Sequence, residues 1–281
     1  MVSKLLPWFN IIRPHNCLGA GLAVLLGTYL AGGQSILITK PALLAVPIVW
    51  LIVAGNNVVN DLCDIQVDRI QKPHRVLPSG RLGISKASIL ASLLFISGLI
   101  LASVISTPSF MIALAASILG IVYSFYLKSS VLLGNAVVGL LSGLSVIYGA
   151  VVISRIDNRV LLAAGFVFVF VFIREILKTI ADLDGDSQLG VTTIATRIGS
   201  RDTFDLFTCL AAIFVVITAL PWFVKYAPNR YLLAIFLGIY IPLISATGLL
   251  WIRFNQVNLR LALRLTKLAW FLGLFALSYL R

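Results

Sequence analysis

Acidic side chains are concentrated in two short windows of the sequence. Three of the ten acidic residues lie at positions 61–68 and four at positions 175–186. In the first window Asn60, Asp64 and Asp68 recur every four residues, so a helix would carry them as one polar ridge. A solvated surface does not gather its acids in this way, and the windows are therefore candidates for chemistry.

The second window repeats this spacing, because Asp182 and Asp186 are also four residues apart. Carboxylates at this spacing on one helix face repel each other unless a cation lies between them. Mg²⁺ binds proteins through a few carboxylates and keeps other positions for phosphate oxygens. Two such pairs facing each other are therefore suited to handling a diphosphate.

Basic residues accompany both windows. Lys72 and Arg75 follow the first one, in a segment whose two prolines and glycine indicate a shaped loop. Lys128, beyond Tyr123, is expected at the same mouth, where an ammonium would meet a diphosphate as a point charge. Lys178 lies one turn before the second window and can share its face. For any single one of these cations, marking topology or binding anionic lipid is the alternative.

Membrane helices must position these groups. The chain has 281 residues, of which 60% are hydrophobic and only 11% charged, whereas soluble domains carry about 25% charged residues. This composition excludes an ordinary soluble enzyme, a disordered chain and a disulfide scaffold. The net charge of +12 is typical of Lys- and Arg-rich cytoplasmic loops, so nucleic acid is not an expected partner.

Uncharged runs predict nine spans, each needing about 20 apolar residues. The run at 87–127 is about twice that length. It is expected to form a hairpin that breaks at Ser106–Ser109, where a proline stops the helix. The other spans are expected at 14–39, 41–60, 129–154, 160–178, 206–224, 231–252 and 268–280, the last extending back over Arg260, Arg264 and Lys267, which share one helix face.

The distribution of basic residues predicts the orientation. Fifteen of the 22 Lys and Arg residues fall on the side that holds the N-terminus, which is therefore expected to be cytoplasmic. Both acidic windows end spans on that side, and the C-terminus is expected outside. A multi-pass protein of a plasma (inner) membrane is predicted.

These motifs resemble the UbiA superfamily of membrane prenyltransferases. The likeness rests on Asn60-x-x-x-Asp64-x-x-x-Asp68, on Asp182-x-x-x-Asp186 and on Lys-Pro-x-Arg-x-Leu-Pro-Ser-Gly at 72–80, and it covers nearly the whole chain. It implies Mg²⁺-dependent transfer of an isoprenoid chain from a prenyl diphosphate to an acceptor. It also implies one all-α domain at 1–281, a bundle of nine helices around a central cavity that opens to membrane lipid, capped by cytosolic-side loops.

The resemblance also implies roles for individual residues. Asn60, Asp64 and Asp68 would hold one Mg²⁺, and Asp182 and Asp186 the other. The four aspartates of these sets and Lys128, which would contact the diphosphate, would be the catalytic residues. The residues expected to bind substrate are Arg75 on diphosphate oxygens, Asn60, Asp61, Lys72, Lys178 and Tyr123 nearby, and Arg13 on the phosphate of an acceptor.

The acceptor is the open question within the superfamily. The segments at 13–24 and 174–193 most resemble the branch that adds a geranylgeranyl group to geranylgeranylglyceryl phosphate in ether-type lipid synthesis. Part of the second motif is shared with enzymes that prenylate aromatic acceptors, so homogentisate, 4-hydroxybenzoate or dihydroxynaphthoate, in quinone or tocopherol biosynthesis, remain alternatives. Other classes also remain: a cation or phosphate transporter, and a scaffold with spent motifs.

Two positions depart from the family pattern. Thr179 stands where members often carry Asp, which puts in doubt how many carboxylates bind the second metal. Val76 stands where Pro is usual.

Overall fold

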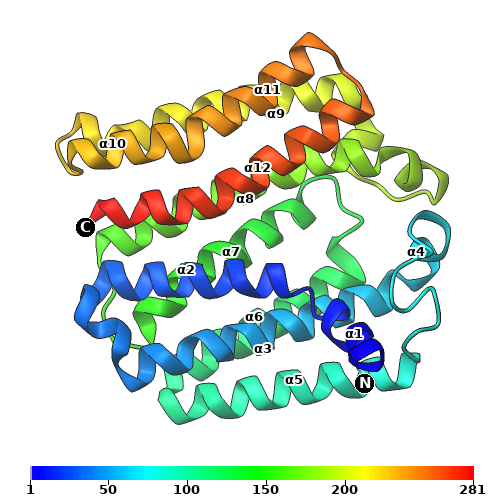
Figure 1. Cartoon of the computed structure of the whole chain (residues 1–281), viewed down its shortest axis with the longest axis horizontal. Helices are drawn as coiled ribbons and strands as arrows, with labels where there is room; N and C mark the ends of the chain where they lie inside the picture. Colours follow the sequence, from blue (N-terminus) through cyan, green and yellow to red (C-terminus); the bar gives the residue numbers. More distant parts are fainter. Residues whose placement is uncertain (1) are drawn as a thin grey trace.

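The computed structural model describes residues 2–281, with side chains described from residue 5 onward, and this part of the chain contains helices and no strand. The long helices lie side by side, with α1 and α4 at one end of the bundle and the C-terminus at the other (Figure 1). The helices are α1 (Val2–Ile11), α2 (Pro14–Gly32), α3 (Lys40–Cys63), α4 (Ile65–Gln71), α5 (Ile84–Ile105), α6 (Thr107–Val122), α7 (Leu133–Val151), α8 (Asn158–Gln188), α9 (Ile194–Phe223), α10 (Asn229–Ile235), α11 (Ile241–Ile252) and α12 (Gln256–Leu277), joined in part by the short turns η1 (Gln34–Ile38), η2 (Tyr123–Leu127), η3 (Phe236–Tyr240) and η4 (Ser278–Leu280).

Eight helical segments among the described residues are long and apolar enough to cross a membrane. They are α3, α5, α6 with η2, α7, α8, α9, α10 to α11 through η3, and α12 with η4. The sequence predicted nine. The remaining segment is α2, a helix of 19 residues. Its first turn contains the polar His15 and Asn16, which lower its mean hydropathy, and it falls outside this set.

Two local predictions are confirmed. The run at 87–127 forms the hairpin of α5 and α6, and the side chain of Ser106 caps α6 by accepting a hydrogen bond from the backbone of Ser109. The last helix begins at Gln256 and so includes the three basic residues that precede the uncharged run.

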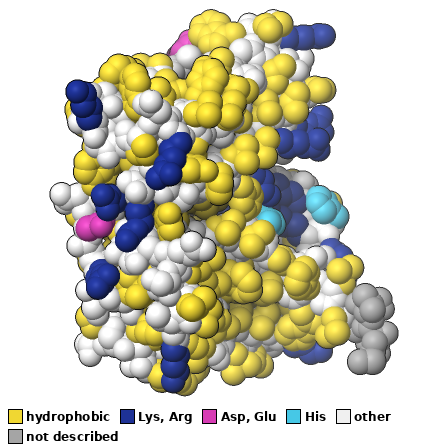
Figure 2. All heavy atoms as spheres, turned by 60° about the vertical axis from the view of Figure 1, so that its left-hand side comes forward, with side chains coloured by type: hydrophobic (Ala, Val, Ile, Leu, Met, Phe, Trp, Pro, Cys, Tyr) yellow, Lys and Arg dark blue, Asp and Glu magenta, His cyan; other side chains and the backbone are white. Residues whose placement is uncertain are grey.

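The outer surface of the bundle is apolar. Large hydrophobic side chains are exposed along the long helices, and hydrophobic surface covers much of the face seen in Figure 2. On α5 they recur on one face, as Ile89, Leu93, Ile96 and Ile100. Exposed apolar area on this scale is incompatible with water and marks a lipid-facing surface. The fold is that of a multi-pass membrane protein.

Candidate active site

A cavity of about 1070 Å³ with both charged and apolar lining residues lies within the bundle. Its walls come from α2, α3, α6, α7, α8 and α12, and both acidic windows contribute to its lining. The deeper lining includes apolar residues such as Ala23, Ile48, Ile52 and Ile112. The cavity therefore offers charged groups to one part of a ligand and apolar walls to another.

The first window does not form the continuous helix that its spacing suggested. Helix α3 ends at Cys63, and Asp64 adopts φ −85° and ψ 0° between α3 and α4. The backbone N–H of Asp68 still donates to the carbonyl of Asp64, at 2.8 Å, so the four-residue register survives the break. Asn60, Asp64 and Asp68 consequently all line the cavity, as the ridge predicted.

Every carboxylate of the first window has a basic partner. Asp68, only 2% exposed, accepts from Nη1 of Arg75 at 2.6 Å. Asp64 is ion-paired with Lys128 and also accepts from the side-chain amide of Asn60 at 3.0 Å. These contacts join α3, α4, the loop after α4 and the end of η2. Buried charges persist when they are paired in this way.

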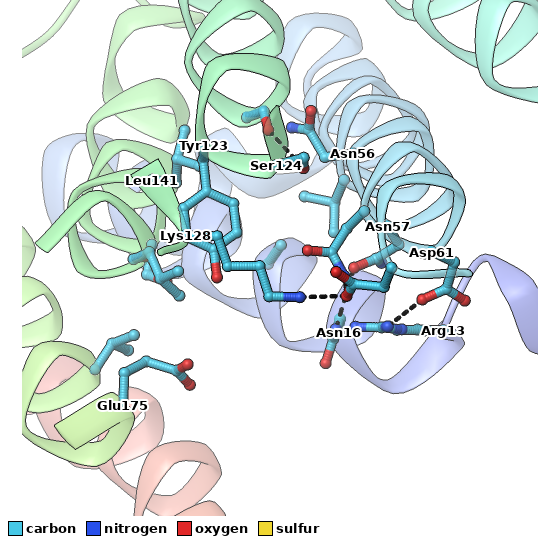
Figure 3. Close-up of a pocket in the computed structure, with 18 of the residues that line it drawn as sticks. Arg13, Asn16, Asn56, Asn57, Asp61, Tyr123, Ser124, Lys128, Leu141 and Glu175 are labelled. Carbon is cyan, nitrogen blue, oxygen red and sulfur yellow. Dashed lines mark hydrogen bonds and ion pairs between the residues drawn. The ribbon is translucent and has the colours of Figure 1, made fainter. Parts of the chain in front are cut away.

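Asp61 was expected only as a substrate-binding candidate, and the structure shows it holding the N-terminal segment. It is ion-paired with Arg13, and Nη1 of Arg75 lies 3.7 Å from the same oxygen (Figure 3). Arg13 joins α1 to α2 in a left-handed conformation, with φ 51°, which is uncommon for a residue other than glycine. The side-chain amide of Asn57 donates to the carbonyl of Ile12 at 2.9 Å and supports this turn.

Tyr123 and Lys128 owe their positions to η2, a π-helical turn at the end of the α6 span. Such wide turns are frequent at functional sites because they re-aim the side chains that follow. Tyr123, Ser124 and Lys128 all line the cavity, and Figure 3 shows the Lys128 side chain extended toward the α3 carboxylates.

The second window lies on the last turns of α8. Asp182 and Asp186 both line the cavity, whereas Asp184 is exposed and lies outside the lining. Nζ of Lys72 lies 3.4 Å from Oδ1 of Asp182, so the loop after the first window reaches the second. The sequence correctly predicted that the two windows meet at one mouth.

The side chain of Gln71, from the first-window helix α4, lies against Gly185 of α8. A Cβ at this position would lie 2.0 Å from Nε2 of Gln71, the last residue of α4. Gly185 thus leaves room for the Gln71 side chain beside Asp186, which lines the cavity.

Glu175 and Arg174 were not among the candidate site residues, although both line the cavity. Glu175 accepts from Arg174 at 3.1 Å and from Lys178 at 3.0 Å. Lys178, a predicted substrate contact, is thus bound to Glu175 in this structure. A signal was available, because Glu175 is the only glutamate in the sequence and lies within an apolar run.

Other polar side chains of the lining were also missed. The sequence signal is the same as for Glu175, because each is a polar residue within an apolar helix. They are Asn16, Asn56, Asn57, Asn135 and Lys267. Oδ1 of Asn56 is buried without a hydrogen-bond partner, which leaves an acceptor facing this region.

Within the described residues, no three His, Cys, Asp or Glu side chains are close enough together to form a metal cage. The donors present still fit Mg²⁺, which takes one or two carboxylates and completes its octahedron with water and substrate phosphates. Asn60, Asp64 and Asp182 supply such oxygens around one shared cavity. The lining therefore fits an ion that arrives with a phosphorylated ligand rather than a closed structural site.

Fold and site together define a multi-pass membrane protein whose charged cavity is continuous with apolar walls, which suits a ligand with an anionic head and a lipid tail. Residues 20–278 match the sequence profile described as the UbiA prenyltransferase family. The chain belongs to this family and is a prenyltransferase by that membership.

Named relatives agree with this assignment. The chain is 34% identical over 238 residues to digeranylgeranylglyceryl phosphate synthase of Saccharolobus solfataricus, covering 84% of this chain and 83% of the relative. It is 37% identical over 198 residues to the synthase of Methanoculleus marisnigri, covering 70% of each.

Two solved structures share the fold. One, described as giving structural and mechanistic insights into digeranylgeranylglyceryl phosphate synthase in membranes, is 27% identical and covers 98% of both chains with a TM-score of 0.76. The other is a UbiA homolog from Archaeoglobus fulgidus bound to GPP and Mg²⁺, 19% identical, with a TM-score of 0.70 over 98% of this chain and 99% of that one.

Proposed function

We propose that this protein transfers a geranylgeranyl group from geranylgeranyl diphosphate to geranylgeranylglyceryl phosphate, using Mg²⁺, in ether-type lipid synthesis. The observation that carries the proposal is the meeting of two acidic windows and their basic partners at one cavity with apolar walls. The names of the relatives point to the glyceryl phosphate acceptor. The A. fulgidus structure, bound to GPP and Mg²⁺, supports the same donor chemistry.

The carboxylates of the two windows are proposed to hold the metal. Asn60, Asp64 and Asp68 would provide ligands on one side of the cavity, and Asp182 and Asp186 on the other. Mg²⁺ bound there would neutralise the leaving diphosphate as a Lewis acid. Thr179, at a position where an additional carboxylate is usual, contributes no anionic ligand, so the second set rests on Asp182 and Asp186.

The basic partners of the carboxylates would bind the diphosphate. Lys128, Arg75 and Lys72 lie at the mouth with their charged ends on Asp64, Asp68 and Asp182. Phosphate oxygens can replace those carboxylates as partners, and the cations then stabilise the negative charge that develops as the diphosphate leaves. Tyr123 lines the same part of the cavity and is proposed as a neighbouring contact.

The transfer of the prenyl group is proposed to take place in the same cavity. The allylic C–O bond breaks and its electron pair leaves with the diphosphate. The acceptor hydroxyl oxygen would then form the new C–O bond, and its proton would pass to the released diphosphate. Apolar side chains such as Ala20, Val49 and Val53 line the walls and would exclude water from the carbocation-like centre.

The membrane arrangement is also proposed. Residues 1–281 would act as one domain in a plasma (inner) membrane, with α2 as the ninth span around the cavity and membrane lipid beside it. The loops at the α1 and α4 end would cap the mouth on the cytosolic side. The excess of Lys and Arg at that side supports a cytoplasmic N-terminus and an external C-terminus.

A product assay tests the function. Purified protein in lipid would receive labelled geranylgeranyl diphosphate, Mg²⁺ and, in separate reactions, geranylgeranylglyceryl phosphate, homogentisate, 4-hydroxybenzoate or dihydroxynaphthoate. We expect product with the glyceryl phosphate. Product only with an aromatic acceptor would overturn the acceptor assignment, and ion flux into vesicles without any product would indicate a transporter.

Matched variants test the site. Asp64→Ala and Asp182→Ala are expected to lower turnover at least 100-fold while the protein still inserts into the membrane. Asp184→Ala is the control, since this exposed carboxylate lies on α8 but outside the cavity lining. Full activity in both cavity variants would contradict the proposed metal site.

A further inference from the structure

Basic side chains also gather on the wall where α2, α8 and α12 line the cavity. His15 of α2, Arg174 of α8 and Lys267 of α12 all line the cavity. They are close enough together for the charges of Arg174 and Lys267 to act on His15, and for Arg174 to act on Lys267. Glu175, the neighbour of Arg174, lies across an open space from the Arg13–Asp61 pair (Figure 3). Figure 2 shows Lys, Arg and His side chains together in a hollow that hydrophobic side chains surround.

The charges on this wall are not balanced by acids. Glu175 is shared between Arg174 and Lys178, so one carboxylate serves two cations. Lys267 has no ion pair among the described residues, and α12 carries no acidic residue at all. Nε of Arg174 is buried without a hydrogen-bond partner.

Positive charge without an acidic partner is costly inside a membrane-spanning helix. Lys267 lies in the middle of a helix that is apolar enough to span the membrane, and its side chain is half-buried. An ionisable residue inside a span is expensive and usually serves a ligand or a partner. Here the missing partner must be an anion that enters the cavity.

We propose that Arg174 and Lys267, assisted by His15, bind the phosphate group of the acceptor lipid, at a site separate from that of the diphosphate. This inference rests on the proposed function. Arg13, which the sequence offered for the same role, is ion-paired with Asp61 of the first acidic window. Arg174 instead shares the single carboxylate of Glu175 with Lys178, and Lys267 has no ion pair among the described residues. Arg174 and Lys267 take its place as the charged contacts of the acceptor.

The position suits the reaction. Arg174 precedes Asp182 by eight residues on α8, about 12 Å along the helix axis. Long basic side chains span part of that distance. The reacting hydroxyl of a glyceryl phosphate is on the carbon next to the one that bears the phosphate. A phosphate held by Arg174 and Lys267 therefore places this hydroxyl between the basic wall and the diphosphate.

The same wall offers a surface for the lipid chain of the acceptor. Trp270 lies one turn beyond Lys267 on α12 and also lines the cavity. Its ring stacks on Phe170 of α8, with ring centroids 6.4 Å apart. The cations and the Trp270 ring, which Phe170 supports from the core, thus present a charged and an apolar contact side by side, as an amphipathic acceptor requires.

The first test separates acceptor binding from donor binding. Initial rates of Lys267→Gln would be measured while each substrate is varied, with geranylgeranylglyceryl phosphate and with neutral geranylgeranylglycerol as acceptors. Losing one charge-assisted hydrogen bond should raise the acceptor KM about tenfold or more. The donor KM should stay within twofold, and the preference of the wild-type protein for the phosphorylated acceptor should collapse. Lys267→Arg should retain that preference.

Arg264→Gln is the matched control, because Arg264 lies on the same helix but is exposed and outside the cavity lining. Its kinetics should match the wild type. If Lys267→Gln does not elute as a folded protein, Arg174→Gln carries the test, since Glu175 then still pairs with Lys178.

A second measurement removes catalysis altogether. Binding of labelled geranylgeranylglyceryl phosphate to protein in lipid nanodiscs, without donor or Mg²⁺, should weaken about tenfold in both cavity variants. Unchanged acceptor KM and binding in both would overturn this inference while leaving the proposed function intact. No turnover of any glyceryl acceptor by the wild type would overturn the proposed function, and the inference would fall with it.

Discussion

The contact between α2 and α7 offers a sharp test of the arrangement on which the cavity depends. A Cβ added to Gly27 would lie 1.8 Å from the backbone oxygen of Val146, and one added to Gly149 would lie 2.0 Å from the oxygen of Val24. The hydroxyl of Thr28 donates to the carbonyl of Gly149 at 2.9 Å. Small residues allow membrane helices to approach this closely.

Gly27→Ala must push these helices apart. An ordinary contact begins at 3.4 Å, so the separation at this point has to grow by 1.6 Å. Overpacking of this kind typically costs about 1–3 kcal/mol, and a backbone carbonyl cannot rotate away as a side chain can. We expect a loss near the upper end, about 3 kcal/mol, together with weakening of the Thr28 hydrogen bond.

Function should suffer too, because both helices line the cavity. Helix α2 carries His15 and Asn16, and α7 carries Ser142 and Ser145. A displacement of about 1 Å near reacting groups can lower a rate by about 100-fold. The predicted phenotype of Gly27→Ala therefore combines lower stability with a lower kcat.

Thermal stability in detergent, followed by size-exclusion chromatography after heating, measures the first effect, and the product assay measures the second. At about 2–4 °C per kcal/mol we expect the apparent Tm to fall by at least about 6 °C. Gly165→Ala on α8 is the control, because no atom lies within 4 Å of its added Cβ. A Gly27→Ala protein with wild-type Tm and activity would refute the packing of α2 on α7.

Three further outcomes follow from the site and the hairpin. Lys128→Met should raise the donor KM at least tenfold, because the diphosphate loses an ammonium contact, and Lys128→Arg should recover part of the loss. An unchanged donor KM would contradict the diphosphate role. Lys72→Ala should change stability by less than about 1 kcal/mol, as expected for the partly exposed Lys72–Asp182 pair. In the kinetic assay, the same substitution should raise the donor KM several-fold. Ser106→Ala should cost about 1 kcal/mol by removing a helix cap and should leave the kinetics unchanged, so a kinetic defect would show that the hairpin influences the cavity.

The sequence was most informative where a single residue or a short period decides the structure. The proline after Ser106 ends α5 at the predicted place. The spacing of Asp182 and Asp186 places both on the cavity face of α8. These outcomes depend on local geometry, which neighbouring elements did not alter.

Features that depend on tertiary contacts were harder to predict. The break at Asp64 is a change of backbone direction between two helices, and the four-residue period continues through it. The sequence could not show that Asp61 binds Arg13 across the α1–α2 turn, because 48 positions separate them. The excess of positive charge around Lys267 appears only when α12 is packed beside α2 and α8.

The pairing of every first-window carboxylate with a cation determines how the mouth can bind its ligand. Asp64 holds Lys128, and Asp68 holds Arg75, in a region where charge is expensive to bury. Lys128 can leave Asp64 without penalty only if phosphate oxygens replace the carboxylate, and Asp64 can lose Lys128 only if another cation takes its place. The diphosphate therefore becomes the new partner of the released Lys or Arg side chain, and the divalent cation becomes the new partner of the released carboxylate. Neither alone restores the balance, so binding of the donor and binding of the metal should depend strongly on each other.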